Sequence, residues 1–118
     1  MVLEVIVLDR MLSSERPIGS RFQIFCSALE GSNVMFSWEK DGSSMQESRA
    51  RIRNEDATSI LSIQKVARTD AGKYTCTAMN AVSSSSVSAK LIVRVMYEWH
   101  RGFIPSFEVL KEIADTTE

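Results

Sequence analysis

The stretch Asp70-Ala71-Gly72-Lys73-Tyr74-Thr75-Cys76 decides the fold. Its first three residues favour a tight turn, and the residues that follow have the alternating character of a β-strand. Tyr74 and Cys76 are two residues apart, so their side chains point to the same face of that strand. The stretch therefore predicts a strand that begins at a turn and turns a tyrosine and a cysteine to one face.

Two upstream residues complete a pattern with this strand. Cys26 precedes Cys76 by 50 residues, and Trp38 follows Cys26 by 12 residues. A tyrosine two residues before the second cysteine is the tyrosine corner of an immunoglobulin sandwich, which also has a tryptophan after the first cysteine. Over residues 1–95 the chain resembles an immunoglobulin domain of the intermediate (I) set. The resemblance implies an all-β, Greek-key β-sandwich.

Short alternating stretches separated by turn residues predict seven strands. They are expected at residues 4–8, 21–28, 34–40, 51–53, 59–64, 73–80 and 87–95. Pro17 and Gly19 interrupt the chain before the second strand, and Asp41-Gly42 predicts a hairpin turn after the third. Alternation directs these side chains to the core: Phe22, Ile24, Cys26, Ala28, Phe36, Trp38, Leu61, Ile63, Ala89, Leu91 and Val93.

The resemblance assigns roles to individual residues. It places the signature residues of the core at Trp38, Leu61, Asp70 and Tyr74. It also implies that Asp70 pairs with an arginine near the start of the strand at 51–53. Arg51 and Arg53 both qualify, and the sequence does not choose between them. Such a pair is expected to hold one end of the sandwich together and to have no chemical role.

Length and composition limit the possible functions. The 118 residues fit one domain, and 44% hydrophobic residues are enough for one sandwich core. A net charge of −1 argues against a nucleic-acid-binding surface. No apolar run approaches the ~20 residues that cross a bilayer, so membrane attachment is expected only through a parent protein. Residues 1–9 do not resemble a signal peptide, so if the parent protein is secreted, the chain is expected to be an excised fragment with Met1 added for expression.

The two cysteines allow one disulfide. The resemblance pairs Cys26 with Cys76, and an oxidised pair indicates an extracellular, cell-surface location. The alternative is two buried thiols in an intracellular domain, because muscle proteins also contain I-set domains. The chain has no Asn-x-Ser/Thr glycosylation site that would help to decide the compartment.

Residues suited to catalysis are sparse. His100 is the single histidine, whereas a metal site needs several ligands and a Ser–His system needs a partnered base. The sequence has no Gly-rich phosphate-binding loop. We therefore expect no enzymatic activity, no metal and no cofactor. For such a module the expected function is recognition of another protein.

A finer resemblance is to adhesion domains of the Down syndrome cell adhesion molecule (Dscam) type. It is carried by residues 17–21, 30–32, 38–42 and 75–81. It implies homophilic adhesion between opposing cells, in which a two-fold contact sets one patch against its copy. One alternative is a structural spacer domain of an intracellular muscle filament protein. Another is an immune-type receptor domain that binds a foreign ligand through its loops, although the loops are short.

The alternation of inward and outward side chains also predicts which face of the sandwich self-associates. Phe25 and Ile60 are large apolar residues at outward positions of neighbouring strands, where a solvated sheet is expected to be polar. The opposite sheet has apolar outward residues as well, Met35 and Met79 among them, but carries more charge. Alternatively, single exposed apolar residues are normal, or the first strand covers them. The expected adhesion face comprises Gln23, Phe25, Arg51, Arg53, Ile60, Ser62 and Gln64.

Residues 96–118 are expected to form a C-terminal tail or linker outside the immunoglobulin pattern. Ser106 is a suitable N-cap for a short helix in which Phe107, Leu110 and Ile113 share one side. Three interpretations remain open: part of a following linker or domain, an ordered tail docked on this or another domain, and a variant C-terminus.

Overall fold

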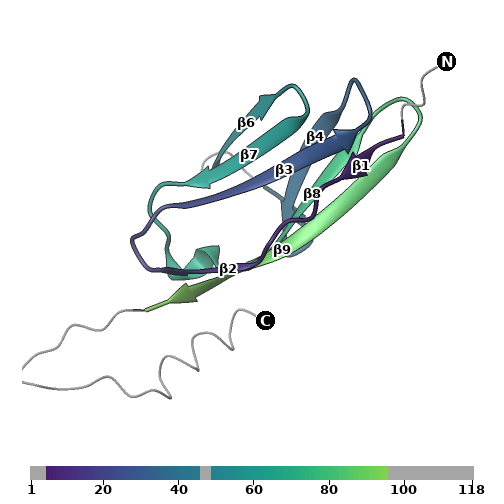
Figure 1. Cartoon of the computed structure of the whole chain (residues 1–118). Coiled ribbons are helices and arrows are strands. Elements are labelled where there is room, and N and C mark those ends of the chain that lie inside the picture. Colours follow the sequence, from purple (N-terminus) through teal and green to yellow (C-terminus); the bar gives the residue numbers. More distant parts are fainter. Residues whose placement is uncertain (1–4, 46–48, 96–118) are drawn as a thin grey trace, which may run out of the picture.

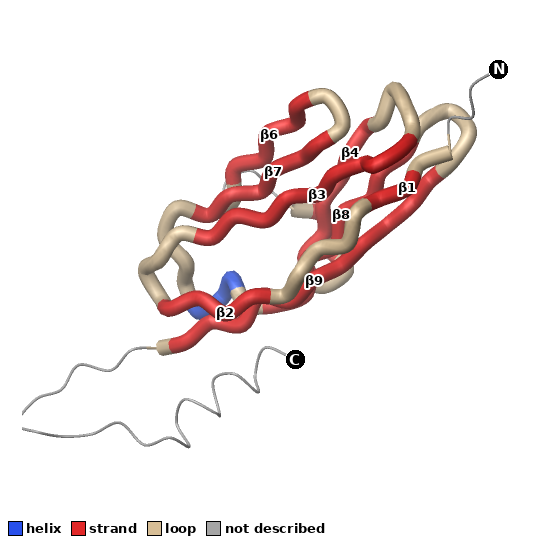
Figure 2. Tube along the Cα trace, viewed as in Figure 1, coloured by secondary structure: helices blue, strands red, loops and turns tan. Residues whose placement is uncertain are grey.

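A computed structural model describes residues 5–45 and 49–95 as two β-sheets packed face to face (Figure 1). One sheet has four strands in the order β1-β3-β7-β6, and the other has five in the order β2-β9-β8-β4-β5. Figure 2 shows the two layers, with one short 3-10 helix, η1 (Arg68–Asp70), at one end of the described sandwich. The expected all-β sandwich is confirmed.

The strands differ widely in length. The four-stranded sheet consists of β1 (Val7–Leu8), β3 (Phe22–Glu30), β7 (Thr58–Ile63) and β6 (Arg51–Glu55). The five-stranded sheet consists of β2 (Ser14–Pro17), β9 (Ser84–Arg94), β8 (Gly72–Met79), β4 (Met35–Lys40) and β5 (Ser43–Ser44). The strand β2 pairs with β9 in parallel, and the other strand pairs of the described residues are antiparallel.

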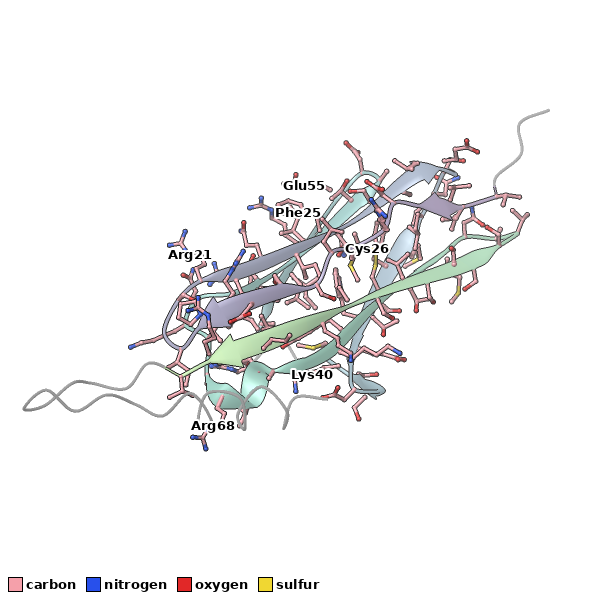
Figure 3. The ribbon with its side chains drawn as sticks, turned by 60° about the horizontal axis from the view of Figure 1, so that its bottom comes forward. Arg21, Phe25, Cys26, Lys40, Glu55 and Arg68 are labelled. Atoms are coloured by element: carbon pink, nitrogen blue, oxygen red, sulfur yellow. A yellow bond between two sulfur atoms is a disulfide. The ribbon has the colours of Figure 1, made fainter. Side chains whose placement is uncertain are left out.

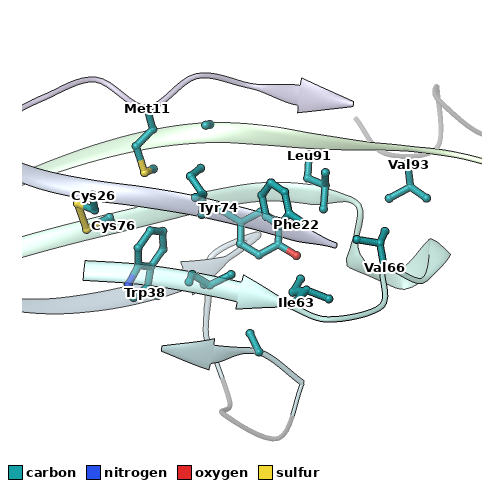
Figure 4. Close-up of a cluster of buried hydrophobic side chains, with 14 residues drawn as sticks. Met11, Phe22, Cys26, Trp38, Ile63, Val66, Tyr74, Cys76, Leu91 and Val93 are labelled. Carbon is teal, nitrogen blue, oxygen red and sulfur yellow. A yellow bond between two sulfur atoms is a disulfide. The ribbon is translucent and has the colours of Figure 1, made fainter. Parts of the chain in front are cut away.

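The core lies between the sheets, around a disulfide that joins Cys26 of β3 to Cys76 of β8 (Figure 4). This confirms the expected pairing and links the two layers covalently. The indole N–H of Trp38 donates a 2.8 Å hydrogen bond to the hydroxyl of Ser59, so a polar group buried beside the core is satisfied. Leu61 is fully buried on β7, at an expected core position.

The tyrosine corner closes one end of the core. The hydroxyl of Tyr74 donates a 2.6 Å hydrogen bond to the backbone oxygen of Asp70, and both residues are buried. The ring of Tyr74 also packs against Phe22, with ring centroids 5.8 Å apart. The contact ties the start of β8 to η1. This short helix ends at Asp70, the first residue of the turn that the sequence predicts before β8.

The arginine partner of Asp70 is Arg49, so the expectation of Arg51 or Arg53 is wrong. Arg49 Nε donates to Asp70 Oδ1 at 2.8 Å, and the backbone N–H of Ala67 donates to Oδ2 at 2.7 Å. Arg51 and Arg53 alternate with Ile52 on β6 and are exposed on the outer face of their sheet. Arg49 precedes that strand and therefore reaches the end of the sandwich where η1 lies.

The N-terminal segment differs most from expectation. One strand was expected at residues 4–8, but β1 covers Val7–Leu8 beside β3, and β2 then pairs with β9 (Figure 1). The segment thus contributes to both sheets. Pro17 was expected to interrupt the chain before the second strand, from its local preference. The long neighbour β9 overrides this preference, and Pro17 is tolerated because β2 is an edge strand.

Smaller differences concern strand ends. The Asp41-Gly42 hairpin is confirmed: φ is 53° and 87° at the two residues, as a type I′ turn requires, and it leads into β5, which was not predicted. The strand β6 continues to Glu55, and β9 begins earlier than expected, at Ser84. Ala28 and Phe36 were expected in the core but are only partly buried.

No helix within residues 5–45 and 49–95 is long and apolar enough to cross a membrane. The expectations for residues 1–4 and for the tail at 96–118, including its short helix, lie outside the described residues.

Candidate recognition surface

The register of β3, β7 and β6 brings six of the seven expected adhesion residues together. Phe25 lies opposite Ile60, and Ile60 lies opposite Arg53. The next row along the strands contains three more of these residues in the same order: Gln23, Ser62 and Arg51. Gln64 is exposed but follows the last residue of β7, so it lies at the margin of this surface. We call the outward side of these three strands the outer face.

The two apolar residues of the outer face differ in exposure. The side chain of Phe25 is 52% exposed, whereas Ile60 is only half-buried and is not among the large exposed apolar residues. Ile60 sits on a strand with a neighbour on each side, and Phe25 and Arg53 flank it. The outer face therefore has one prominent apolar residue, Phe25 on the β3 side of its central row, where two were expected.

Hydrogen bonds fix the polar side chains around Phe25. Gln23 Nε2 donates to the Ser62 hydroxyl at 3.2 Å in the row on one side. In the row on the other side, the hydroxyls of Ser27 and Thr58 are 3.3 Å apart. These cross-strand contacts hold the rows beside Phe25 in place.

Charge changes sign along the outer face. Arg51 lies in the row on one side of Phe25, and Glu55 lies opposite Thr58 in the row on the other side. Arg53 in the central row forms a 3.1 Å ion pair with Glu55. Figure 3 shows Arg21 and Glu55 on the outer side of the sandwich with Phe25, and Cys26 inside. Sequence reasoning missed this polarity because it follows from the register of three strands.

The opposite face belongs to the five-stranded sheet and has a different character. Met35 of β4 and Met79 of β8 are opposite each other, with exposed fractions of 75% and 51%. Further along, pairs of hydroxyls bridge β8 and β9, with Thr75 and Ser88 2.8 Å apart. This face is a polar sheet with one apolar end.

Within the residues that the structure describes, no three His, Cys, Asp or Glu residues lie close enough to hold a metal ion. Burial, followed by the charge of Asp70, raises the pKa of the Tyr74 phenol far above its usual value. A hydrogen bond from the backbone N–H of Lys73 lowers the pKa of the Asp41 carboxyl. Both shifts arise from contacts that stabilise turns and ends of the sandwich.

Comparison with known proteins agrees with this architecture. The family model of the immunoglobulin I-set domain matches residues 8–93 of the sequence. The chain belongs to this family. The match includes both cysteines of the disulfide, the buried tryptophan and the tyrosine corner.

Relatives of this I-set domain are found in several kinds of protein. Hemicentin-1 of Mus musculus is 48% identical over 88 residues, which cover 74% of this chain and 1% of that protein. Vascular endothelial growth factor receptor 3 of Coturnix coturnix is 31% identical over 97 residues, covering 72% of this chain and 7% of the receptor. A titin I-band fragment, I67–I69, superimposes with a TM-score of 0.72 at 26% identity, covering 76% of this chain and 32% of the fragment.

These matches establish the family of the domain. The chain spans only 1–7% of the length of such curated relatives. They point to several kinds of I-set protein rather than to Dscam-type proteins specifically. The I-set assignment is therefore firm, and the activity of a whole protein does not follow from it.

Proposed function

We propose that this I-set domain is a module for protein–protein recognition that binds a second copy of itself through the outer face of the four-stranded sheet. The observation that carries the proposal is Phe25, an aromatic side chain 52% exposed in the central row of a face whose rows on either side carry opposite charges. Aromatic residues at the centre of a patch are the usual anchors of protein interfaces.

The charge pattern suits a copy of the same face. A two-fold axis that runs perpendicular to the strands, along the row of Phe25, reverses the order of the rows in the second copy. The row of Arg51 in one copy then lies against the row of Glu55 in the other. Arg51 then faces Glu55 of the second copy, at both ends of the contact, while Phe25 meets its own counterpart. Arg53 of the central row lies against Arg53 of the second copy, and each keeps its partner Glu55 within its own chain.

Sedimentation of purified protein tests the face. Phe25→Asp is expected to weaken dimerisation at least tenfold, because it places a charge at the apolar centre. Met35→Asp is a matched control, since it makes the same kind of change at a 75% exposed apolar residue on the opposite sheet. An unchanged dimer constant for Phe25→Asp, or an equal loss for Met35→Asp, would rule out the outer face.

Charge reversal tests the arrangement of the two copies. Arg51→Glu alone, like Glu55→Arg alone, sets like charges against each other and is expected to weaken association. The double variant restores opposite charges across the proposed contact and is expected to recover it. If the double variant binds no better than the single ones while Phe25→Asp still abolishes association, the face is right and the two-fold arrangement is wrong.

We further propose that the domain acts outside the cell, as part of a surface protein, and that residues 96–118 are a segment separate from the domain. The disulfide supports the first point, because such bonds persist in oxidising compartments. Similarity to a growth factor receptor supports it as well. A chain that ends at residue 95 is expected to unfold at the same temperature as the full chain if the division is correct.

A structural spacer in a muscle filament is the second candidate function, and the likeness to titin I-band domains favours it. A spacer in that setting is expected to keep Cys26 and Cys76 reduced and to remain monomeric. Mass spectrometry of protein alkylated at the moment of lysis from its natural source separates the two. Unmodified cysteines joined in a disulfide support the extracellular proposal, and two alkylated cysteines support the spacer.

A further inference from the structure

Two lysines face each other on the sheet opposite the outer face. Lys73 of β8 is the direct partner of Lys90 of β9 in the antiparallel register. Like charges at directly opposed positions destabilise a sheet. Within the described part of the chain, neither ammonium has a carboxylate within ion-pair distance. The positive charge of this pair is therefore not neutralised by the residues that the structure describes.

The neighbouring acids on this sheet do not neutralise the lysines. Asp41 Oδ1 accepts the backbone N–H of Lys73 at 2.9 Å, and its Oδ2 pairs with the ammonium of Lys40 at 3.3 Å. Glu39 lies opposite Thr75, one row away from the lysine pair, and forms no ion pair with a described residue. Positive potential thus persists over the lysine pair.

A hollow of about 270 Å³ lies at this pair. Its lining consists of Ser13, Lys73, Ser88, Ala89 and Lys90. The Ser13 oxygen accepts the backbone N–H of Lys90 at 2.9 Å, which leaves the hydroxyl proton to donate to another group. Each ammonium has three donors and no acceptor. The lining therefore combines positive charge with hydrogen-bond donors.

We infer that this lysine site, defined as Ser13, Lys73, Ser88 and Lys90, binds a sulfate-type oxyanion. A free sulfate ion is doubly charged and a sulfate ester on a saccharide is singly charged, and both only accept hydrogen bonds, which matches ammonium groups with neighbouring hydroxyls. The two forms present the same kind of acceptor oxygens to the site. The site lies on the other sheet from Phe25, so it is independent of the proposed self-association.

Binding can be measured by amide chemical shifts during titration with sodium sulfate, with sodium chloride matched for ionic strength. Saturable shifts at Ser13, Lys73, Ser88 and Lys90 are expected with sulfate and not with chloride. Lys73→Gln or Lys90→Gln is expected to weaken sulfate binding about thirtyfold, the factor for one ammonium about 4 Å from a doubly charged ion in water. Lys65→Gln removes the same charge from an exposed residue outside the lysine site, so it is expected to leave binding unchanged.

A sulfated disaccharide in a second titration separates the two sources. If the disaccharide binds more tightly than free sulfate, and Lys73→Gln/Lys90→Gln loses this binding, a saccharide ester is the preferred form. Equal affinity with the same dependence on both lysines identifies the free ion. Shifts that grow linearly without saturation, that occur equally with chloride, or that persist in the double variant overturn the inference. Melting temperatures of the variants in chloride confirm that each one is folded.

Discussion

Replacing Tyr74 with phenylalanine tests the physical basis of the tyrosine corner. The change removes one hydroxyl and keeps the ring, so the contact with Phe22 and the packing of the core are preserved. It deletes the 2.6 Å hydrogen bond to the backbone oxygen of Asp70, in a region where both residues are at most 2% exposed. The carbonyl group then loses a donor without gaining access to water.

The expected loss follows from that burial. A buried acceptor left without its partner costs about 1–3 kcal/mol. We therefore expect Tyr74→Phe to lower the free energy of unfolding by about 2 kcal/mol at pH 7, which is about 8–16 °C in melting temperature for a domain of this size. Thr75→Val is the matched control: it deletes an exposed hydroxyl from the same strand, and a loss below about 0.5 kcal/mol is expected.

The pH dependence of the same variant gives an independent check. Burial raises the pKa of the Tyr74 phenol in the folded protein above the usual value of 10. The neutral phenol is thus favoured by folding, and its contribution is complete below pH 10. Above pH 10 the unfolded chain loses this proton while the folded one keeps it, so stability falls by up to about 1.4 kcal/mol per pH unit.

Urea unfolding of both proteins at pH 7 and pH 11 measures this effect. Groups other than Tyr74 titrate in both proteins, so their contribution cancels in the difference. The stability difference between wild type and Tyr74→Phe is expected to shrink by about 1.4 kcal/mol at pH 11, because only the wild type can lose the Tyr74 proton. A difference that stays constant between the two pH values would refute the reasoning, as would a loss below 0.5 kcal/mol at pH 7.

Three further changes probe the same end of the sandwich and its covalent link. Arg49→Gln is expected to reduce stability by about 1–3 kcal/mol in urea unfolding, since it removes the partner of a buried carboxylate, whereas Arg51→Gln should change it by less than about 0.5 kcal/mol. Gly72→Ala is expected to be destabilising by about 1–2 kcal/mol, because its φ of +154° is rarely adopted by residues with a side chain and the new Cβ would displace the Asp41 carboxylate; an unchanged urea midpoint contradicts this. Reduction of the disulfide is expected to remove about 4 kcal/mol, and equal stability with and without reductant is the contrary result.

Sequence reasoning succeeded where a residue type has one dominant structural use. A tyrosine two residues before a cysteine, with a tryptophan between the two cysteines, predicted the buried centre around Trp38 and the disulfide. The Asp41-Gly42 pair predicted a hairpin because few residues accept positive φ at two successive positions. The hairpin depends on local chemistry, whereas the buried centre and the disulfide were implied by the resemblance to immunoglobulin domains.

It failed where the outcome depends on partners distant in the chain. Arg49 reaches Asp70 because it lies before the start of β6, and nothing in the local sequence separates it from Arg51 or Arg53. The strand β2 forms because β9 is long enough to pair with it. Ile60 is partly covered by the side chains on either side of it. Each of these depends on which strands become neighbours.

The outer face shows how the core determines the recognition surface. Phe25 precedes Cys26 on β3, and adjacent residues of a strand point to opposite sides of the sheet. A shift of β3 by one residue would bury Phe25 and expose Cys26, which its disulfide prevents. The pairing of β3 with β7, and of β7 with β6, then sets Arg51 and Glu55 on opposite sides of the Phe25 row. The charge arrangement that favours a second copy is thus a consequence of the same bond that holds the two sheets together.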